Sequence, residues 1–252
     1  MKIFRILSGF IAAAIFLLII TVILAYSFME SILFPSPHTG KKTGNMTLIS
    51  GNAELDVFYH RGSGMHPVIL YSHGNNEYLA KIQPWLNEFK NRGYSILAYD
   101  YAGYGGSSGK AGEKQAKLDI ETAFKFLTEK ERFMPQEIIV IGYSVGSGPS
   151  SYLASGHKVR KLILIAPFAS AVQVVFKKSL PFDRFKNAEE LSRSTVPVTI
   201  FHGDKDRLIP FRNAETVYRN AAGPKKLIKV SGADHINIFK LFTNEFWKEL
   251  EL

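Results

Sequence analysis

Residues 142–146 place a serine where it could act as a nucleophile. Their sequence is Gly-Tyr-Ser-Val-Gly, they follow the apolar run 138–141, and a segment of small residues comes next, at 147–154. A serine held on a sharp turn between a strand and a helix needs small flanking residues, because the strained turn leaves no room for larger ones. The spacing therefore predicts that Ser144 lies on such a turn and attacks an electrophilic carbon.

A serine hydroxyl is a weak nucleophile and needs a histidine base, which a carboxylate in turn orients. Three histidines follow Ser144 in the chain, namely His157, His202 and His235. His157 follows a glycine and is expected at the surface, and His202 ends an apolar run. His235 lies in the segment 232–238, between the last predicted strand and the last predicted helix, from which it can reach the serine. We therefore predict that His235 is the base.

The carboxylate is expected in the loop after the next-to-last predicted strand. The sequence there is His-Gly-Asp-Lys-Asp-Arg at 202–207, which offers Asp204 and Asp206. Asp204 is suited to accept hydrogen bonds from N–H groups within the turn. A third carboxylate, Asp234, is adjacent to the predicted base. The choice of Asp206 rests on a family pattern given below.

A second loop could bind the negative charge that develops during attack. Ser-His-Gly-Asn at 72–75 directly follows the apolar run 68–72. In enzymes with this arrangement of strands, backbone N–H groups of such a loop and of the residue after the nucleophile bind the oxyanion. We predict that Asn75 and Val145 supply these two donors. The His-Gly pair alone is equally compatible with a simple turn.

The elements that must position these residues alternate along the chain. From residue 46 onward, short β-like runs are followed by helical segments, which is the pattern of a mostly parallel sheet covered by helices. The first two runs, around Gly51 and Asn52, predict an antiparallel hairpin. Strands are predicted at 46–50, 54–59, 68–72, 95–99, 138–141, 161–165, 198–201 and 226–230. Helices are predicted at 81–91, 113–129, 147–154, 211–221 and 238–249.

The glycine-rich segment 103–110 does not fit a nucleotide-binding loop. A P-loop would need glycine at Tyr104 and serine or threonine at Ala111, and GxGxxG would need glycine at Ser108. The segment is therefore interpreted as a turn between a strand and a helix, and no nucleotide cofactor is predicted.

The chain of 252 residues has a formal net charge of +9 and no cysteine. Lys2, Arg5 and Glu30 are the charged residues before position 31, so the basicity belongs to the rest of the chain. The lack of cysteine excludes disulfides, a cysteine nucleophile and thiolate metal ligands. Basic residues are scattered without a long run or nucleic-acid motif, which disfavours a nucleic-acid partner and favours an anionic membrane surface.

Residues 6–29 are uncharged and largely apolar. As a helix rising about 1.5 Å per residue, this run exceeds the ~30 Å hydrocarbon core of a bilayer. The competing interpretation is a cleaved signal peptide, for which residues 25–27 offer a cleavage site, but the apolar regions of signal peptides are usually about 7–15 residues long. We therefore predict an uncleaved transmembrane anchor over 1–30.

The charges beside the anchor predict its orientation. Lys2 and Arg5 precede the apolar run, whereas the other end begins with Glu30 and reaches its first lysines at Lys41 and Lys42. The positive-inside rule then places the N-terminus in the cytoplasm and the domain outside it, in the periplasm if the cell has two membranes.

A connector at 31–45, with two prolines and two glycines, is predicted to join the anchor to one α/β catalytic domain at 46–252. Within that domain, residues around 167–196 depart from the alternation of strands and helices and are predicted to form a small cap. Their apolar residues are interspersed with lysines and arginines. This pattern is compatible with an acyl-binding roof that has a basic rim, and equally with a simple cover for the edge of the sheet.

Five motifs together resemble the α/β-hydrolase superfamily over about residues 45–250. They are Ser-His-Gly-Asn at 72–75, Tyr-Asp-Tyr-Ala-Gly-Tyr-Gly at 99–105, Gly-Tyr-Ser-Val-Gly at 142–146, His-Gly-Asp-Lys-Asp at 202–206 and Gly-Ala-Asp-His at 232–235. Within the superfamily the chain is similar to a membrane-anchored branch of bacterial α/β hydrolases without an assigned substrate and eukaryotic protein depalmitoylases. In that family the acid is the last residue of HGxxD, which implies Asp206, and the segment around Asp100 is a structural turn.

The combined expectation is a serine hydrolase that cleaves carboxylic esters or thioesters of small-molecule or lipid-like acyl compounds. Ser144 forms an acyl-enzyme, His235 transfers the proton and Asp206 orients the imidazole, without a metal or organic cofactor. A serine peptidase or amidase would share these residues. The alternative of another class is a non-catalytic, membrane-tethered binding protein on a hydrolase scaffold, although a scaffold has no need to keep all three side chains.

Overall fold

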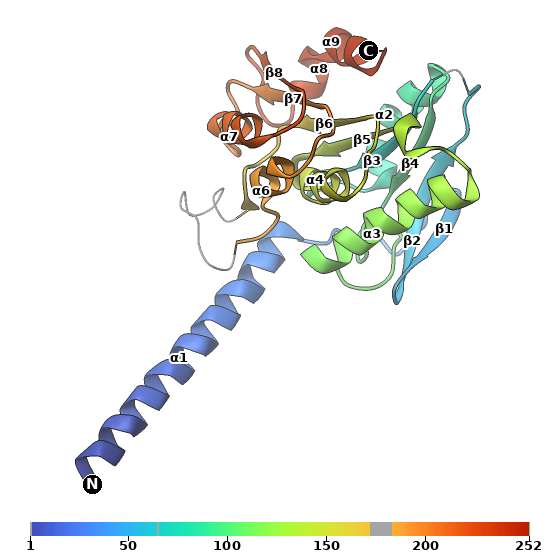
Figure 1. Cartoon of the computed structure of the whole chain (residues 1–252). Helices are drawn as coiled ribbons and strands as arrows, with labels where there is room; N and C mark the ends of the chain where they lie inside the picture. Colours follow the sequence, from blue (N-terminus) through green and yellow to red (C-terminus); the bar gives the residue numbers. More distant parts are fainter. Residues whose placement is uncertain (1, 65, 172–182, 252) are drawn as a thin grey trace.

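The strands of the protein form one sheet. The computed structural model describes residues 2–64, 66–171 and 183–251, and in that part of the chain eight strands lie in the order β1-β2-β4-β3-β5-β6-β7-β8 (Figure 1). The strands are β1 (Met46–Ser50), β2 (Ala53–His60), β3 (Val68–Ser72), β4 (Ser95–Tyr99), β5 (Ile138–Tyr143), β6 (Lys161–Ile165), β7 (Val198–Gly203) and β8 (Lys225–Val230).

The sheet is mostly parallel. β1 pairs antiparallel with β2, and β2 pairs antiparallel with β4. From β4 onward every pair of neighbours is parallel. The predicted hairpin and the predicted α/β architecture are therefore confirmed. Since the carboxyl ends of parallel strands lie at one edge of the sheet, the loops after β3, β5, β7 and β8 come together there.

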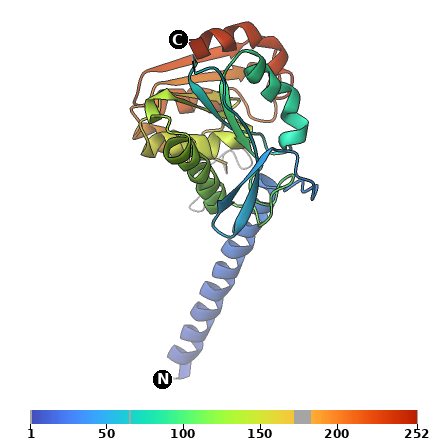
Figure 2. The ribbon, with the colours of Figure 1, turned by 90° about the vertical axis from the view of Figure 1, so that its right-hand side faces the viewer.

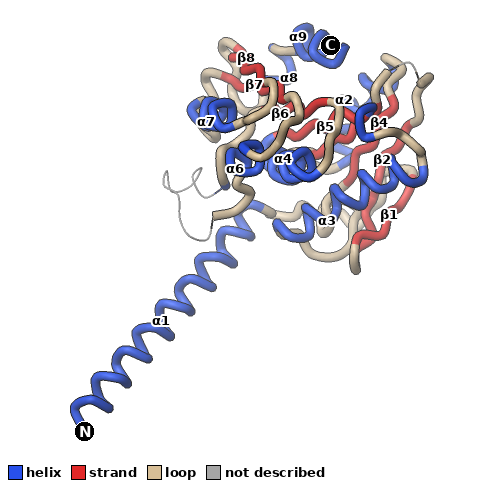
Figure 3. Tube along the Cα trace, in the orientation of Figure 1, coloured by secondary structure: helices blue, strands red, loops and turns tan. Residues whose placement is uncertain are grey.

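Helices cover both faces of this sheet, as the tube in Figure 3 and the rotated view in Figure 2 show. α2, α8 and α9 pack on one face, and α3, α4, α6 and α7 pack on the other. Their bounds are α2 (Leu79–Asn91), α3 (Glu113–Lys125), α4 (Ser147–Gly156), α6 (Asn187–Ser192), α7 (Arg212–Asn220), α8 (Ile238–Leu241) and α9 (Thr243–Glu251).

Strand β3 illustrates why the central strands are apolar throughout. Val68 and Leu70 belong to the core beneath α3 and α4, whereas Ile69 and Tyr71 belong to the core beneath α2 and α9. Side chains alternate between the faces of a strand, and both faces are covered here, so neither set can be polar.

The N-terminal residues form helix α1 (Lys2–Leu33), which extends away from the sheet in Figures 1 and 2. The side chains of residues 11–24 are exposed, including those of Phe16 and Leu17. Among the helices of the described residues, none is long and apolar enough to cross a bilayer. This finding does not support the transmembrane anchor predicted for 1–30.

The predicted connector is held against the domain. Phe34 is buried, with its ring 6.4 Å from that of Tyr104 and 5.9 Å from that of Phe185. Thr39 N–H donates to the carbonyl of Gly105 at 2.8 Å, and Gly105 N–H donates to the carbonyl of Pro37 at 3.0 Å. The base of α1 is therefore fixed beside the glycine-rich turn that follows β4.

Two segments differ from the sequence-based expectation. The predicted helix at 238–249 is interrupted at Phe242, whose backbone leaves the helix so that its buried ring packs 5.0 Å from the ring of Phe201. In the predicted cap, α6 is a helix that was not predicted, and it packs on α4 and α7. The rest of the cap prediction falls partly on residues 172–182, which lie outside the described residues.

Candidate active site

Ser144 lies on a tight turn between β5 and α4. Its φ of +50° is in the left-handed region, which L-residues with a side chain adopt at a cost of about 1–3 kcal/mol. The two flanking glycines make the turn possible. A Cβ on Gly142 would lie 2.5 Å from the carbonyl oxygen of Gly146, and a Cβ on Gly146 would lie 2.2 Å from the carbonyl oxygen of Ser72. The spacing Gly-x-Ser-x-Gly is therefore a steric requirement of this backbone.

His235 lies between the serine and a carboxylate. Its Nε2 is 3.0 Å from Ser144 Oγ, and its Nδ1 is 2.7 Å from Asp206 Oδ2. The three residues come from the loops after β5, β7 and β8, and each is at most 9% exposed. With Nδ1–H donating to Asp206, Nε2 is left as the acceptor for the serine proton. The structure thus brings together the three residues that the sequence predicted.

Asp206 is fixed by the backbone of its own loop. Its Oδ1 accepts hydrogen bonds from Leu208 N–H at 3.0 Å and Ile209 N–H at 2.8 Å. These bonds leave Oδ2 directed at His235. His202, the other histidine of the loop, donates from Nε2 to the carbonyl of Ile209 at 2.7 Å, and burial lowers its pKa. His202 therefore shapes the turn that presents the acid.

The remaining candidates make contacts with groups other than Ser144. Asp204 Oδ1 accepts the N–H of Gly232 at 2.8 Å, which ties the loop after β7 to the loop after β8. Asp234 Oδ1 accepts the N–H groups of Ile236 and Asn237, at 2.9 and 2.8 Å. His157 Nε2 lies 3.1 Å from the carboxylate of Glu121, away from the serine. Each of these side chains has a local structural role.

The loop after β3 adjoins the serine turn, as the predicted oxyanion site requires. Ser72 is paired with Gly142 in the parallel register of β3 and β5. A Cβ on Gly74 would lie 2.7 Å from the ring of Tyr143, so this glycine lets the two loops approach. Asn75 follows it in the turn, and Val145 follows Ser144 and is buried. Both predicted donors are therefore carried by adjoining loops.

Two residues that stabilise this arrangement were not predicted. Glu77 Oε2 accepts the N–H of Gly74 at 2.7 Å, and Glu77 N–H donates to the carbonyl of Gly74 at 3.2 Å. Tyr143 donates its hydroxyl hydrogen bond to the carbonyl of His235 at 2.9 Å and stacks on the imidazole at 5.5 Å. Tyr143 is part of the serine motif, but nothing in the sequence signals either contact, because both depend on loops meeting at the sheet edge.

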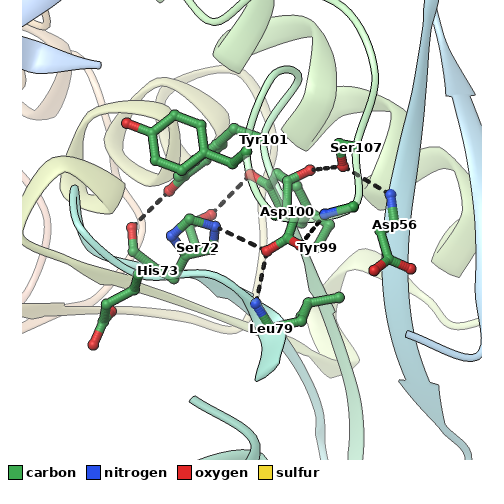
Figure 4. Close-up of polar contacts among 12 residues, drawn as sticks. Asp56, Ser72, His73, Leu79, Tyr99, Asp100, Tyr101 and Ser107 are labelled. Carbon is green, nitrogen blue, oxygen red and sulfur yellow. Dashed lines mark hydrogen bonds and ion pairs between the residues drawn. The ribbon is translucent and has the colours of Figure 1, made fainter. Parts of the chain in front are cut away.

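A polar cluster at the carboxyl end of β4 supports the same loop (Figure 4). Asp100 Oδ1 accepts the N–H of Leu79, the first residue of α2, at 2.7 Å, and lies 3.6 Å from His73 Nε2. Tyr101 donates its hydroxyl hydrogen bond to the carbonyl of His73 at 2.8 Å. Burial raises the pKa of Asp100 to about 7 and lowers the pKa of His73 to about 4. The segment around Asp100 thus fixes the start of α2 and the loop at 72–75.

A pocket of about 450 Å³ opens beside His235. Its lining includes Lys205, Arg207 and Leu208 from the loop after β7, and Ile236 from the loop after β8. Within the described residues there is no group of three or more His, Asp or Glu side chains that could hold a metal ion.

Comparisons with known sequences identify relatives of this chain. A family model described as serine aminopeptidase, S33, matches residues 64–186. Alpha/beta hydrolase domain-containing protein 17B of Homo sapiens is 33% identical over 192 residues, which cover 75% of this chain and 67% of that protein. Alpha/beta hydrolase domain-containing protein 17C of Mus musculus is 34% identical over 174 residues, covering 68% of this chain and 54% of that protein.

Solved structures share the fold at much lower identity. An esterase of Pyrococcus furiosus superimposes with a TM-score of 0.69 at 18% identity, covering 81% of this chain and 88% of that one. Est1E of Butyrivibrio proteoclasticus, solved with ferulic acid bound, gives a TM-score of 0.67 at 15% identity, covering 82% and 99%. The predicted α/β-hydrolase fold is confirmed for the sheet and its flanking helices.

Proposed function

The chain belongs to the α/β-hydrolase superfamily and is a serine hydrolase, and from this premise we propose that Ser144, His235 and Asp206 form its catalytic triad. The observation that carries the proposal is the continuous series of contacts from Ser144 Oγ to His235 Nε2 and from His235 Nδ1 to Asp206 Oδ2. Support also comes from the left-handed backbone of Ser144, a strain that persists where surrounding structure enforces it.

In the proposed reaction, Ser144 Oγ attacks the carbonyl carbon of the substrate while its proton moves to His235 Nε2. Asp206 holds the imidazole in the required tautomer and stabilises the imidazolium. The bond between the carbonyl carbon and the leaving oxygen or sulfur then breaks, and His235 returns the proton to that atom. Water then attacks the carbonyl carbon of the acyl-enzyme while His235 takes its proton. The carboxylic acid leaves, and His235 returns the proton to Ser144 Oγ.

The oxyanion is proposed to be bound by the backbone N–H groups of Asn75 and Val145. The loops that carry these two residues lie next to each other, because β3 and β5 are neighbours in the sheet. The Tyr104 hydroxyl also donates to Asn75 Oδ1 at 3.1 Å, which stabilises the loop after β3. Donors that are held in place before the reaction stabilise the developing negative charge without reorganisation. Each such donor lowers the activation free energy by roughly 3–4 kcal/mol.

Carboxylic esters and thioesters are the proposed substrates. The pocket at His235 is open to solvent and has exposed apolar side chains, Leu208 and Ile236, in its wall. Solved proteins with the same fold include ones named as esterases. A small-molecule or lipid-like acyl compound could place its carbonyl at Ser144 and its leaving group in this pocket.

Hydrolysis of a short acyl ester and of the matching thioester tests the proposal. We expect Ser144→Ala to lower kcat by about 10⁶-fold, because the nucleophile is lost. Ser192→Ala, a change at an exposed serine of α6, is the control and should retain wild-type turnover. Turnover of both substrates by folded Ser144→Ala at the wild-type rate would contradict the proposal.

A peptidase or amidase is a second candidate, since the family model that matches residues 64–186 is described as a serine aminopeptidase. The same triad chemistry would apply to an amide, with His235 protonating a nitrogen. A screen of aminoacyl amides beside esters of the same acyl group separates the two. Faster turnover of the amides would favour the peptidase, and a folded protein inert to every class would favour a binding protein.

We also propose that the domain works at a membrane surface, outside the cytoplasm. The exposed apolar side chains of residues 11–24 support membrane attachment, and the packing of Phe34 on Tyr104 fixes the base of α1 near the candidate site. We expect the full chain to sediment with membranes and Ile15→Asp/Leu18→Asp to release it. In intact spheroplasts we expect added protease to reach the domain, and a protected domain would contradict the orientation.

A further inference from the structure

The pocket beside His235 is lined by both apolar and cationic side chains. Leu208 and Ile236 are 62% and 80% exposed and form apolar walls. Lys205 and Arg207, which flank the proposed acid, line the same pocket and are also exposed. Apolar and cationic groups thus lie together around the imidazole.

The two cations are available to a ligand. Among the described residues, no carboxylate lies within ion-pair distance of Lys205 or Arg207. The carboxylate in the pocket, Asp234, accepts two backbone N–H groups, from Ile236 and Asn237, and these hydrogen bonds lower its pKa. Asp234 is therefore occupied by its own turn, and the pocket keeps a net positive charge.

The position of the pocket identifies which part of a substrate would enter it. In acyl transfer the imidazole that takes the proton from the serine returns it to the leaving atom, so the leaving group must lie on the imidazole side of the serine. His235 itself lines the pocket. Ser144 is not among the lining residues. A leaving group that extends from the serine past the imidazole would enter the pocket between Leu208 and Ile236, toward Lys205 and Arg207.

We propose that this pocket is a leaving-group subsite that selects acyl esters or thioesters whose alcohol or thiol carries a phosphate. An apolar linker next to the leaving oxygen or sulfur would contact Leu208 and Ile236. The phosphate beyond it would accept charge-assisted hydrogen bonds from Arg207 and Lys205, which suit phosphate geometry. This inference rests on the triad proposed above, which supplies the bond cleavage and the proton for the departing alcohol or thiol.

Such a phosphate could belong to a soluble thiol or to a lipid headgroup, and paired substrates distinguish these sources. The soluble pair is octanoyl-coenzyme A against octanoyl-N-acetylcysteamine, which share the acyl thioester but differ in phosphate. The lipid pair is 1-oleoyl lysophosphatidate against 1-oleoylglycerol, presented in the same neutral detergent. For each pair the measured quantity is the ratio of kcat/KM for the anionic member to kcat/KM for the neutral member.

We expect the full-length wild type to prefer the anionic member of at least one pair by about tenfold or more, and the preference to shrink as salt is raised, because exposed charges are screened. Lys205→Gln/Arg207→Gln should lower that ratio about tenfold. Lys114→Gln/Lys125→Gln, which removes two exposed cations from α3, is the charge-matched control and should keep the wild-type ratio.

Labelling of Ser144 by an uncharged fluorophosphonate is measured on every variant. Normal labelling with no anionic preference in either pair, or with equal loss in both double variants, overturns the subsite while leaving the triad standing. Absence of labelling in the folded wild type overturns the triad, and the subsite with it. A preference confined to the soluble pair assigns the phosphothiol as ligand, and one confined to the lipid pair assigns the headgroup.

Discussion

Two histidine–aspartate pairs lie at the same edge of the sheet, and they differ in access rather than in residue type. His235 Nδ1 is 2.7 Å from Asp206 Oδ2, and its other nitrogen meets Ser144 Oγ beside an open pocket. His73 Nε2 is 3.6 Å from Asp100 Oδ1, and both side chains are fully buried. The first pair lies beside a pocket that is open to solvent, and the second is sealed from solvent.

In the sealed pair, His73 and Asp100, burial shifts both pKa values toward the neutral forms. Burial lowers the pKa of His73 to about 4 and raises that of Asp100 to about 7, so both groups are driven toward their neutral forms. His73 Nδ1–H donates a hydrogen bond to the carbonyl oxygen of Gly74 at 2.8 Å, and Asp100 accepts the N–H groups of Leu79 and Gly106. This pair stabilises the loop after β3 and the start of α2, and that loop adjoins the serine turn.

The largest expected difference between the pairs is catalytic. Asp206→Asn should lower kcat by about 10⁴-fold, because an amide in place of the carboxylate favours the wrong tautomer of His235. Asp100→Asn should leave kcat within about tenfold of wild type, since Asp100 contacts no reacting group. Ester hydrolysis by the two variants measures this, with Asp204→Asn as the control in the same loop as the acid. An inactive Asp204→Asn with an active Asp206→Asn would reverse the assignment.

The serine turn depends on glycine on both sides of Ser144. Gly146→Ala would bring a Cβ within 2.2 Å of the Ser72 carbonyl oxygen, so β3 and the turn must separate. We expect a loss of about 3 kcal/mol or more in the free energy of unfolding, comparable to overpacking in a tight core. Urea unfolding checks this. Gly156→Ala is the control, because a Cβ at Gly156 meets nothing within 4 Å, and it should change stability far less.

Glu77 connects the two regions, since it orders the loop that runs from His73 to the proposed oxyanion donor. Glu77→Ala should lower kcat by about tenfold to a hundredfold with little change in KM, because the Gly74 N–H loses its acceptor and the backbone at Asn75 is held less firmly. Glu77→Gln retains an acceptor oxygen and should recover most of the loss. Equal kcat in the Ala, Gln and wild-type proteins would contradict a role for Glu77 in ordering the proposed oxyanion loop.

The smallest expected effect is the pH dependence of stability at the sealed pair. The folded protein holds a proton on Asp100 up to about pH 7, whereas an unfolded aspartate releases it near 3.8, so ionisation of Asp100 lowers stability as pH rises between these values. Asp100→Asn cannot ionise. Its destabilisation relative to wild type should therefore shrink between pH 5 and pH 8, by about 1–3 kcal/mol. A constant difference in urea unfolding at the two pH values would contradict this.

Local sequence was sufficient to predict most of the fold. β1, β3, β4 and β6 have their predicted bounds, because short apolar runs between turn residues leave few alternatives. The helix break at Phe242 was not predictable, since it depends on where the ring of Phe201 lies. Helix α6 was not predicted for the same reason, because it is stabilised by its packing on α4 and α7 rather than by a local pattern.

The candidate site divides along a similar line. Ser144, Asp206 and His235 each occur in a motif directly after a strand, and a parallel sheet places such loops at one edge. Glu77, Tyr143 and the buried state of Asp100 depend on distances between loops, and no pattern within one segment encodes them. Sequence could therefore name the proposed reacting groups but not the residues that hold them in place.

The proposed role of Ser144 as the nucleophile is tested most directly by identifying the residue that a fluorophosphonate modifies. The full-length protein is treated with an uncharged probe, digested, and the adduct is located by mass spectrometry. We expect one adduct per chain on Ser144, formed rapidly in wild type and slowly in His235→Ala. A rapid adduct on another serine, or a Ser144 adduct that forms as fast without the imidazole of His235, would contradict it.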